Sequence, residues 1–227
     1  MVTSKQIKAV IIGHAVDDAL GVPAEFCGRD TLRARPVTDM RGYGTHPVPA
    51  GAWSDDTSMS LTALGSLIEK GVDYNDMMQQ FAKWFLFGKY TPTGEVFDIG
   101  FSCMKAIRTY LDLQDRSALL CGGSAETENG NGSLMRINSI CLILYAKGAK
   151  KETAIEIVHN VSALTHAHAR SKVACGIYAY VLWELLKNPC KQSAVNGLSL
   201  AENDYFVKKV YGEKFADERA LRECISM

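Results

Sequence analysis

The sequence predicts an all-α fold in one compact multi-helix domain. Apolar residues recur at three- and four-residue spacing along most of the chain, and no segment shows the alternating pattern of a half-buried strand. The 227 residues are 47% hydrophobic and 22% charged, which is typical of a globular chain that can bury one large core. There is no internal repeat, low-complexity tract or interdomain linker, so we expect a single domain over residues 1–227.

Helix-breaking residues divide the periodic pattern into separate expected helices. These cover residues 6–20, 57–69, 75–87, 97–111, 133–147, 152–163 and 169–187. The breakers between them are Gly71, Gly88 with Pro92 and Gly94, the group Gly122, Gly123, Gly130 and Gly132, then Gly148 and Pro189. Residues 28–52 form a long polar connection rich in arginine, glycine and proline, and such long connections often carry function.

Composition excludes several classes of partner. Lysine plus arginine equals aspartate plus glutamate at 25 each, with no long block of either sign, so we expect neither nucleic acid nor a membrane as partner. The N-terminal apolar run is too short for a membrane span and is followed by no signal-peptide cleavage site, which indicates a cytoplasmic protein. The seven cysteines form no CxxC pair and are expected to be reduced core thiols.

The first chemical motif is GAWSDDT at residues 51–57, directly before an apolar-periodic segment. Ser54 fits a helix N-cap, which would place Asp55 and Asp56 in the first turn, where carboxylates complement the helix dipole. The same hydroxyl and carboxylates also supply hard oxygen ligands of the kind that Mg²⁺ prefers. Spacing alone favours capping, and metal binding stays open.

The second motif is GNGSLMR at residues 130–136, before a long apolar helix expected to begin near Ser133. Glycines allow close approach of a ligand to the backbone, and free N–H groups at a helix start bind anions such as a diphosphate. An ordinary loop-to-helix turn is the alternative, because Asn131 tolerates left-handed geometry. The motif lacks the lysine of a P-loop and the preceding strand of a dinucleotide fold.

Two further segments place polar residues in apolar surroundings. His166 and His168 lie in THAH at residues 165–168, between two expected helices, where capping or packing is the alternative to ligand binding. Asp17, Asp18 and Glu25 interrupt the apolar pattern of the first helix and its end, and a charge in such a place needs a partner or a functional cavity.

These motifs together resemble the ADP-ribosylglycohydrolase family. The resemblance rests on GHAVDDALGVPAEF at residues 13–26, WSDDT at 53–57, GNGSLMR at 130–136 and THAH at 165–168, in this order and on expected helices. The segment KYTPTGEVFDIG at residues 89–100 also looks like a segment that the family carries between its second and third motifs. The similarity spans roughly residues 6–185 and implies the all-helical fold of that family.

The resemblance also implies a function and a site. It implies a hydrolase that uses a binuclear Mg²⁺ or Mn²⁺ centre to cleave the glycosidic bond between ADP-ribose and a protein side chain or small acceptor. Its catalytic residues would be Glu25, in a general acid or base role, with Asp55 and Asp56, which would ligate the metals together with Ser54. The ligand would be ADP-ribose or an ADP-ribosylated protein. Its diphosphate and distal ribose would bind Asn129, Gly130, Asn131, Gly132 and Ser133, and His166 would contact the ligand nearby.

One family motif is missing, the GGDTDT-like segment that completes the metal site. The acids after residue 200 lack Asp-x-Asp-Thr spacing: they are Glu202, Asp204, Glu213, Asp217, Glu218 and Glu223. We therefore expect a domain shortened at its C-terminus relative to the family. With only Ser54, Asp55 and Asp56 as ligands, we expect fewer than two metal ions, because each hard cation takes about six oxygens. The alternative function is a catalytically impaired ADP-ribose-binding or structural relative. The sequence leaves arginine, serine and small-conjugate linkages open.

Overall fold

The computed structural model describes residues 2–112 and 117–216, and its regular structure is helical. The α-helices are α1 (Ser4–Gly21), α2 (Arg29–Ala34), α3 (Asp55–Lys70), α4 (Tyr74–Phe87), α5 (Phe101–Asp112), α6 (Ile137–Ala146), α7 (Lys151–Ala163), α8 (Ala169–Lys187) and α9 (Lys191–Glu202). Short 3-10 turns are η1 (Val22–Ala24), η2 (Ala118–Leu120), η3 (Glu126–Glu128), η4 (Leu134–Arg136) and η6 (Glu213–Phe215), and η5 (Asn203–Val207) is a π-turn. Over the described residues there is no strand, only an isolated bridge between Gly123 and His166, so the all-α prediction is confirmed.

Local chemistry at the helix ends explains where these helices start and stop. Thr3 and Gln6 form a reciprocal capping box at α1, and the side chain of Asp73 accepts a hydrogen bond from Asp76 N at the start of α4. Gly71 and Gly88 follow the last residues of α3 and α4 with positive φ angles of 70° and 63°, which side chains with a Cβ avoid. The sequence predicted both stops.

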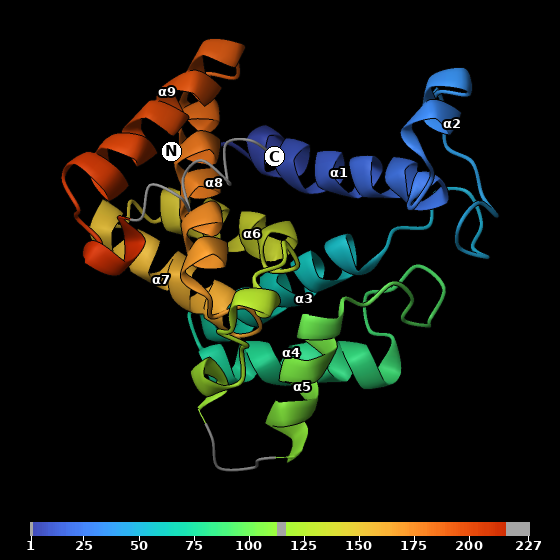
Figure 1. Ribbon diagram of the computed structural model, residues 1–227, viewed down its shortest axis with the longest axis horizontal. Coiled ribbons are helices and arrows are strands. Elements are labelled where there is room, and N and C mark those ends of the chain that lie inside the picture. Colours follow the sequence, from blue (N-terminus) through green and yellow to red (C-terminus); the bar gives the residue numbers. More distant parts are fainter. Residues whose placement is uncertain (1, 113–116, 217–227) are drawn as a thin grey trace.

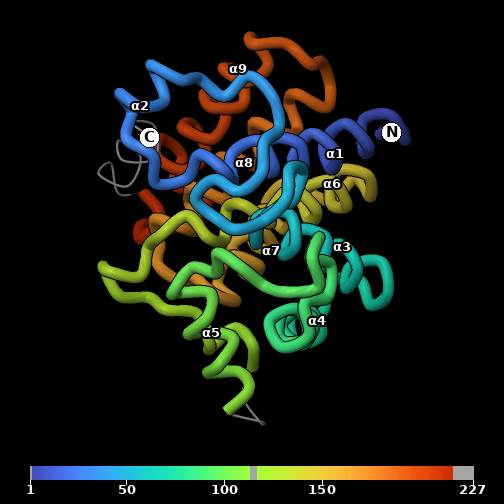
Figure 2. Tube along the Cα trace, turned by 90° about the vertical axis from the view of Figure 1, so that its right-hand side faces the viewer, coloured from blue at the N-terminus to red at the C-terminus, as the bar shows by residue number. Residues whose placement is uncertain are grey.

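The core lies between helices from both halves of the chain (Figure 1). Helix α3 packs against α1, α4 and α6, and α8 packs against α6, α7 and α9. Figure 2 shows the same order from the side, with α1 above α3 and α3 above α4. The largest fully buried side chains include Trp84, Phe81 and Met59. None of the helices in residues 2–112 and 117–216 is long and apolar enough to cross a membrane.

Two expected helices start four residues later in the structure, and one short helix was not expected. Residues 28–52 contain the short helix α2, which buries none of its residues and so carries no apolar periodicity. Helix α5 begins at Phe101 instead of residue 97, because Asp98 adopts a left-handed backbone with φ of 54°. The helix expected at 133 begins as the 3-10 turn η4, and α6 starts at Ile137.

Helix α9 was missed because its buried face is made of small residues. Ser193, Gly197 and Ala201, each four positions apart, are its buried residues, whereas Val195, Leu198 and Leu200 are exposed. A Cβ placed on Gly197 would lie 2.6 Å from the Cα of Val181 in α8. The close approach of two backbones leaves no place for the large apolar residues by which helix periodicity is recognised.

Candidate functional site

One polar cavity of about 520 Å³ collects residues that lie far apart in the sequence. Its lining comprises Glu25, Phe26, Asp55, Asp56, Asp98, Gly100, Phe101, Ser102, Cys103, Thr127, Gly130, Asn131, Gly132, Met135 and His166. Residues from all four sequence motifs therefore meet in one place. A second cavity, of about 340 Å³, is lined by residues between the middle of α6 and the end of α9 and contains none of the candidate site residues.

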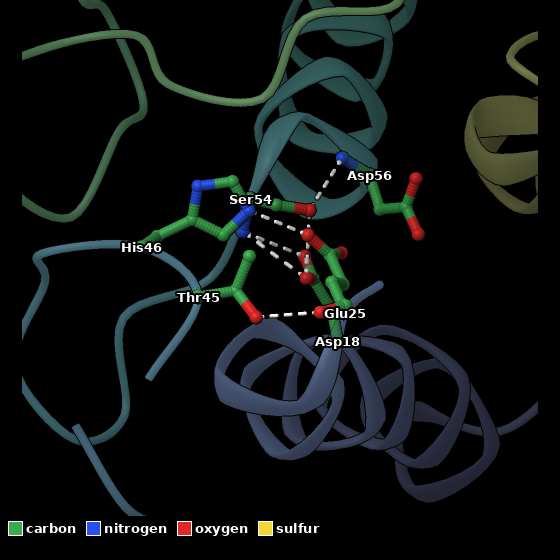
Figure 3. Close-up of polar contacts among 6 residues, drawn as sticks. All are labelled: Asp18, Glu25, Thr45, His46, Ser54 and Asp56. Carbon is green, nitrogen blue, oxygen red and sulfur yellow. Dashed lines mark hydrogen bonds and ion pairs between the residues drawn. The ribbon is translucent and has the colours of Figure 1, made fainter. Parts of the chain in front are cut away.

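The start of α3 is held by a carboxylate from α1 (Figure 3). The two Oδ atoms of Asp18 accept hydrogen bonds from Ser54 N at 3.1 and 3.0 Å, from Ser54 Oγ at 2.8 Å and from Thr57 N at 3.0 Å. Ser54 Oγ in turn accepts a hydrogen bond from Asp56 N, as an N-cap does. Asp18 and Ser54 thus accept hydrogen bonds from N–H groups at the start of α3, and the carboxylates of Asp55 and Asp56 line the cavity.

Asp55 and Asp56 lie close to other negative charges in a partly dry environment. Asp55 is only 7% exposed. Burial, followed by the charges of Asp56 and Asp98, raises the pKa of Asp55 to about 8. Burial and the charge of Asp18 raise the pKa of Asp56 to about 6. A positive charge in the cavity would stabilise the ionised forms of both carboxylates.

Glu25 is clamped by the loop that follows α2. Thr45 Oγ1 donates a hydrogen bond to the backbone oxygen of Glu25 at 2.5 Å, and His46 Nε2 lies 2.7 Å from Glu25 Oε2 (Figure 3). A Cβ on Gly44 would lie 2.2 Å from the oxygen of Pro23, so the loop can approach the turn only with glycine there. The loop therefore fixes both the backbone and the carboxylate of Glu25. Burial is the largest cause of the raised pKa of Glu25, which His46 partly offsets and Asp98 reinforces.

His46 and Asp98 are site residues that the sequence reading did not assign. Ligand atoms of Glu25, His46 and Asp98 all lie within 4.8 Å of one another, an arrangement that could hold a metal ion. Asp98 lies in the segment at residues 89–100, which resembles a segment of the family. That resemblance could have identified Asp98 as a candidate site residue. His46 lies within the 28–52 connection, and no spacing relates it to Glu25.

The glycine motif and His166 form the other wall of the cavity. A Cβ on Gly132 would lie 3.0 Å from His166 Cε1 and 3.2 Å from Cys103 Sγ. Neither Gly130 nor Gly132 has a positive φ angle, so these positions need glycine for space and not for an unusual backbone. Burial, followed by the charge of Arg136, lowers the pKa of His166 to about 4, so the ring is neutral at physiological pH.

Three residues that the resemblance implied do not line this cavity. Ser54 is 3% exposed and binds Asp18 and Asp56 N. Asn129 donates its side-chain amide to Glu126 O. Ser133 is buried with its hydroxyl 2.8 Å from that of Ser162. Their assigned roles stay predictions, whereas the capping interpretation of Ser54 is supported directly.

The sequence also drew attention to His168, to the cysteines and to the acids after residue 200. His168 caps α8 by accepting a hydrogen bond from Arg170 N, as the capping alternative predicts. The expectation of core thiols is confirmed for Cys103, Cys121, Cys141 and Cys175, which are buried, and is wrong for Cys27 and Cys190, which are exposed; Cys224 lies outside the described residues. Among the acids after residue 200, Asp204 is buried and paired with Lys151, whereas Asp217, Glu218 and Glu223 lie outside the described residues.

The cavity has the charge and donor atoms that a divalent cation requires. Glu25, Asp55, Asp56 and Asp98 all line it, and no lysine or arginine of the described residues forms an ion pair with any of them. Burial first, and then the neighbouring negative charges, raise the pKa values of Asp55 and Asp56. Carboxylate oxygens are the ligands that Mg²⁺ and Mn²⁺ take, so these residues fit such an ion.

Comparison with known proteins finds similar sequences. The family model described as ADP-ribosylglycohydrolase matches residues 2–225. The chain is 29% identical to ADP-ribosylarginine hydrolase Tri1 of Serratia proteamaculans over 188 residues, which are 82% of this chain and 49% of that protein. It is 30% identical to the Tri1 hydrolase of Pseudomonas putida over 159 residues, 67% of this chain and 41% of that one.

A third relative and a solved structure extend the similarity. The ADP-ribosyl-dinitrogen reductase glycohydrolase of Rhodospirillum rubrum is 29% identical over 212 residues, which are 90% of this chain and 67% of that protein. A structure of an ADP-ribosylglycohydrolase-related protein complex superposes with a TM-score of 0.69 at 25% identity, over 86% of this chain and 61% of that one. The chain spans about half the length of the first curated relatives that it matches.

Proposed function

The chain belongs to the ADP-ribosylglycohydrolase family, and from this premise we propose that it hydrolyses the glycosidic bond between ADP-ribose and a protein side chain. The observation that carries the proposal is the convergence of Glu25, Asp55, Asp56, Asn131 and His166 on one cavity of about 520 Å³. A cavity of that size is in the range of sites that hold small molecules and cofactors. The names of the relatives support ADP-ribose as the group that is released.

The two walls of the cavity suit the two parts of the ligand. The Gly130–Gly132 wall carries no carboxylate and offers backbone N–H groups and the neutral His166 ring, which suits an anionic diphosphate. The opposite wall carries Glu25, Asp55, Asp56 and Asp98, which suits the ribose carbon where positive charge develops during bond cleavage. The ligand would therefore lie across the cavity with its scissile bond at the carboxylates.

Asp55, Asp56 and the neighbouring Glu25 and Asp98 are the residues that would hold Mg²⁺ or Mn²⁺. A bound divalent ion supplies charge neutralisation, orientation of ribose hydroxyls and a more acidic water. Ser54 would act indirectly, because its hydroxyl fixes the first turn of α3 from which Asp55 and Asp56 project. The four carboxylates offer fewer oxygens than two six-coordinate ions take, which supports the expectation of fewer than two ions.

Glu25 is the residue best placed to transfer a proton. In hydrolysis, water adds to the ribose carbon, the bond to the acceptor atom breaks, one water proton is accepted by the protein and the acceptor atom leaves protonated. The pKa of Glu25 is raised by burial, which brings the carboxylate closer to the range in which a group both accepts and returns a proton. The clamp formed by Thr45 and His46 holds it at one position while it does so.

Arginine is the acceptor that we propose. Two of the relatives are named as ADP-ribosylarginine hydrolases. The two linkages differ chemically, since the guanidinium of arginine is positively charged at all physiological pH values and the O-glycoside of serine is neutral.

The proposal is tested by turnover. The protein is incubated with arginine-linked and with serine-linked ADP-ribosyl peptides in Mn²⁺ or Mg²⁺, and released ADP-ribose is measured by chromatography. We expect release from the arginine-linked peptide, and a loss of about 100-fold or more in Glu25→Gln, since removing a proton-transfer group costs that much. Glu69→Gln, an exposed position on α3, is the matched control and should leave the rate unchanged.

Binding separates this function from the alternative. Gly132→Val should abolish most ADP-ribose affinity, because the new side chain would press on His166 and Cys103 and fill the wall of the cavity. Tight ADP-ribose binding without turnover of either peptide would instead indicate a binding protein of the same family. Failure to bind ADP-ribose at all would refute both.

A further inference from the structure

The contacts of His166 determine which of its two ring nitrogens carries the proton. Its Nδ1 lies 2.8 Å from Thr165 Oγ1, and Thr165 is fully buried, so no solvent water competes for that contact. The opposite nitrogen, Nε2, faces the glycine wall: it would lie 3.7 Å from a Cβ on Gly130 and 3.4 Å from one on Gly132. The direction of the Thr165–His166 hydrogen bond therefore sets what the ring presents to the cavity.

Arg136 sets that direction. Its Nη2 donates to Thr165 Oγ1 at 2.8 Å and to Val161 O at 3.1 Å, and its Nη1 donates to Gly132 O at 3.0 Å. A guanidinium has donors and no acceptor, so Thr165 Oγ1 can only accept from it. The single O–H of Thr165 is then left to donate to His166 Nδ1.

The opposite arrangement leaves a buried donor almost unsatisfied. If Nδ1 carried the proton, Thr165 Oγ1 would accept from both Arg136 and His166, and its own O–H would face Cys103 Sγ at 3.9 Å, a weak acceptor. A buried donor without a good partner disfavours that state by roughly tenfold or more. The neutral ring of His166 has only one N–H, which must then be on Nε2.

We propose that Thr165, oriented by the buried Arg136, is a positioning residue that locks His166 in its Nε2–H tautomer, so that the ring donates a hydrogen bond to a ligand oxygen at the glycine wall. The inference rests on the proposed function for the identity of that ligand. His166 is thereby a binding donor and not a proton acceptor. Because Arg136 also holds Gly132 O, the same side chain orients the ring and the glycine wall together.

The tautomer is read directly by long-range ¹H–¹⁵N NMR of histidine-labelled protein without ligand. The chain has five histidines, and His166→Asn identifies the signal. We expect the Nε2–H form in the native protein and in Thr165→Ser, which keeps the hydroxyl. In Thr165→Val, which removes the hydroxyl at nearly constant size, we expect the Nδ1–H form to become populated. Thr62→Val, another fully buried threonine and outside the cavity, is the matched control.

Affinity supplies the second readout. Calorimetry with ADP-ribose should show about tenfold weaker binding for Thr165→Val, and a change within about twofold for Thr165→Ser and Thr62→Val. A native His166 protonated on Nδ1, or an unchanged Nε2–H form and affinity in Thr165→Val, would overturn the inference.

If Thr165→Val fails to fold, a measurement on the native protein still tests the direction of the Thr165–His166 hydrogen bond. The buried Thr165 hydroxyl proton should give a slowly exchanging resonance with a nuclear Overhauser effect to His166 Hε1, and its absence would overturn the inference. Since the tautomer is measured without ligand, a failure of the proposed function, seen as no ADP-ribose binding, remains distinguishable from a failure of this inference.

Discussion

Asp55 combines an ordinary helix position with an unfavourable electrostatic environment. Its carboxylate is buried beside Asp56 and Asp98 and has a pKa near 8, far above the value of 3.8 of an exposed aspartate. Its backbone, by contrast, lies in an ordinary helix start that Asp18 and Ser54 cap. The helix position was predictable from spacing. The raised pKa arises first from burial, then from the adjacent Asp56, and then from Asp98 and Asp18, which are distant in sequence.

This arrangement predicts a pH dependence of stability in the absence of metal. The folded-state pKa of Asp55 is raised, so the folded chain binds more protons than the unfolded chain between about pH 4 and pH 8, and stability falls as pH rises through that window. We expect the free energy of unfolding in chelator to be on the order of 2–4 kcal/mol lower at pH 8 than at pH 5. Urea denaturation at the two pH values measures it.

The matched variant is Asp55→Asn, which keeps the shape of the side chain and removes its charge. We expect it to lose more than half of the pH dependence and to be more stable than the native chain at pH 8. A variant with the same pH dependence as the native chain would show that the repulsion is not at Asp55. Millimolar Mn²⁺ should stabilise the native chain at pH 8 and not the variant.

Among the elements, the pair α8 and α9 shows a contact that hydrophobic patterning does not reveal. Gly197 lets the two backbones approach, since a Cβ there would meet Val181 Cα at 2.6 Å and Tyr180 O at 2.9 Å. Backbone atoms on the neighbouring helix cannot move aside as a flexible side chain can. The glycine is therefore kept in a helix interior in spite of its low helix propensity.

A pair of glycine substitutions tests this packing. Gly197→Ala should lower the free energy of unfolding by about 1–3 kcal/mol, because overpacking outweighs the gain in helix propensity. Gly13→Ala, in α1 with no atom within 4 Å of the added Cβ, should raise it by about 0.5–1 kcal/mol. Thermal and urea unfolding measure both. Equal stabilisation by the two substitutions would mean that α9 does not pack closely on α8.

At the scale of the whole molecule, the site joins segments that lie far apart along the chain. Glu25 follows η1, His46 lies in the loop after α2, Asp55 and Asp56 begin α3, and Asp98 precedes α5. A cation bound between these segments would stabilise the tertiary fold as a whole, since it would bind only the assembled site.

We expect the chain to bind one divalent ion or none per molecule, and weakly. Equilibrium dialysis with Mn²⁺ measures the stoichiometry, and the change in melting temperature at millimolar Mn²⁺ measures the coupling to folding. Asp56→Asn should stay folded, because its carboxylate repels its neighbours in the absence of metal, and should lose the metal response. Two tightly bound ions with rapid turnover would contradict this expectation, and unfolding of Asp56→Asn without any metal effect would indicate a purely structural aspartate.

Most residues of the candidate site could be singled out from the sequence, because they stand in short motifs. Asp55 and Asp56, the glycine motif and His166 stand in short motifs whose residues are adjacent, so local spacing was enough to single them out. His46 and Asp98 act through neighbours at distances of 21 and more residues, and each is brought to Glu25 by a loop whose path depends on glycine and left-handed backbone geometry. The hydrophobic periodicity of the sequence does not predict such long-range contacts.

Most of the helices, their ends at Gly71 and Gly88, the cap at Ser54 and the resemblance to the family follow from the sequence, because each depends on short local patterns of residues. The contact of Asp18 with the start of α3, the hold of His46 on Glu25, the packing of α9 on α8 at Gly197 and the orientation of His166 by Arg136 and Thr165 became visible in the folded chain alone. These are contacts between segments distant along the chain. Their energies depend on burial and direction, and both exist only once the helices have packed.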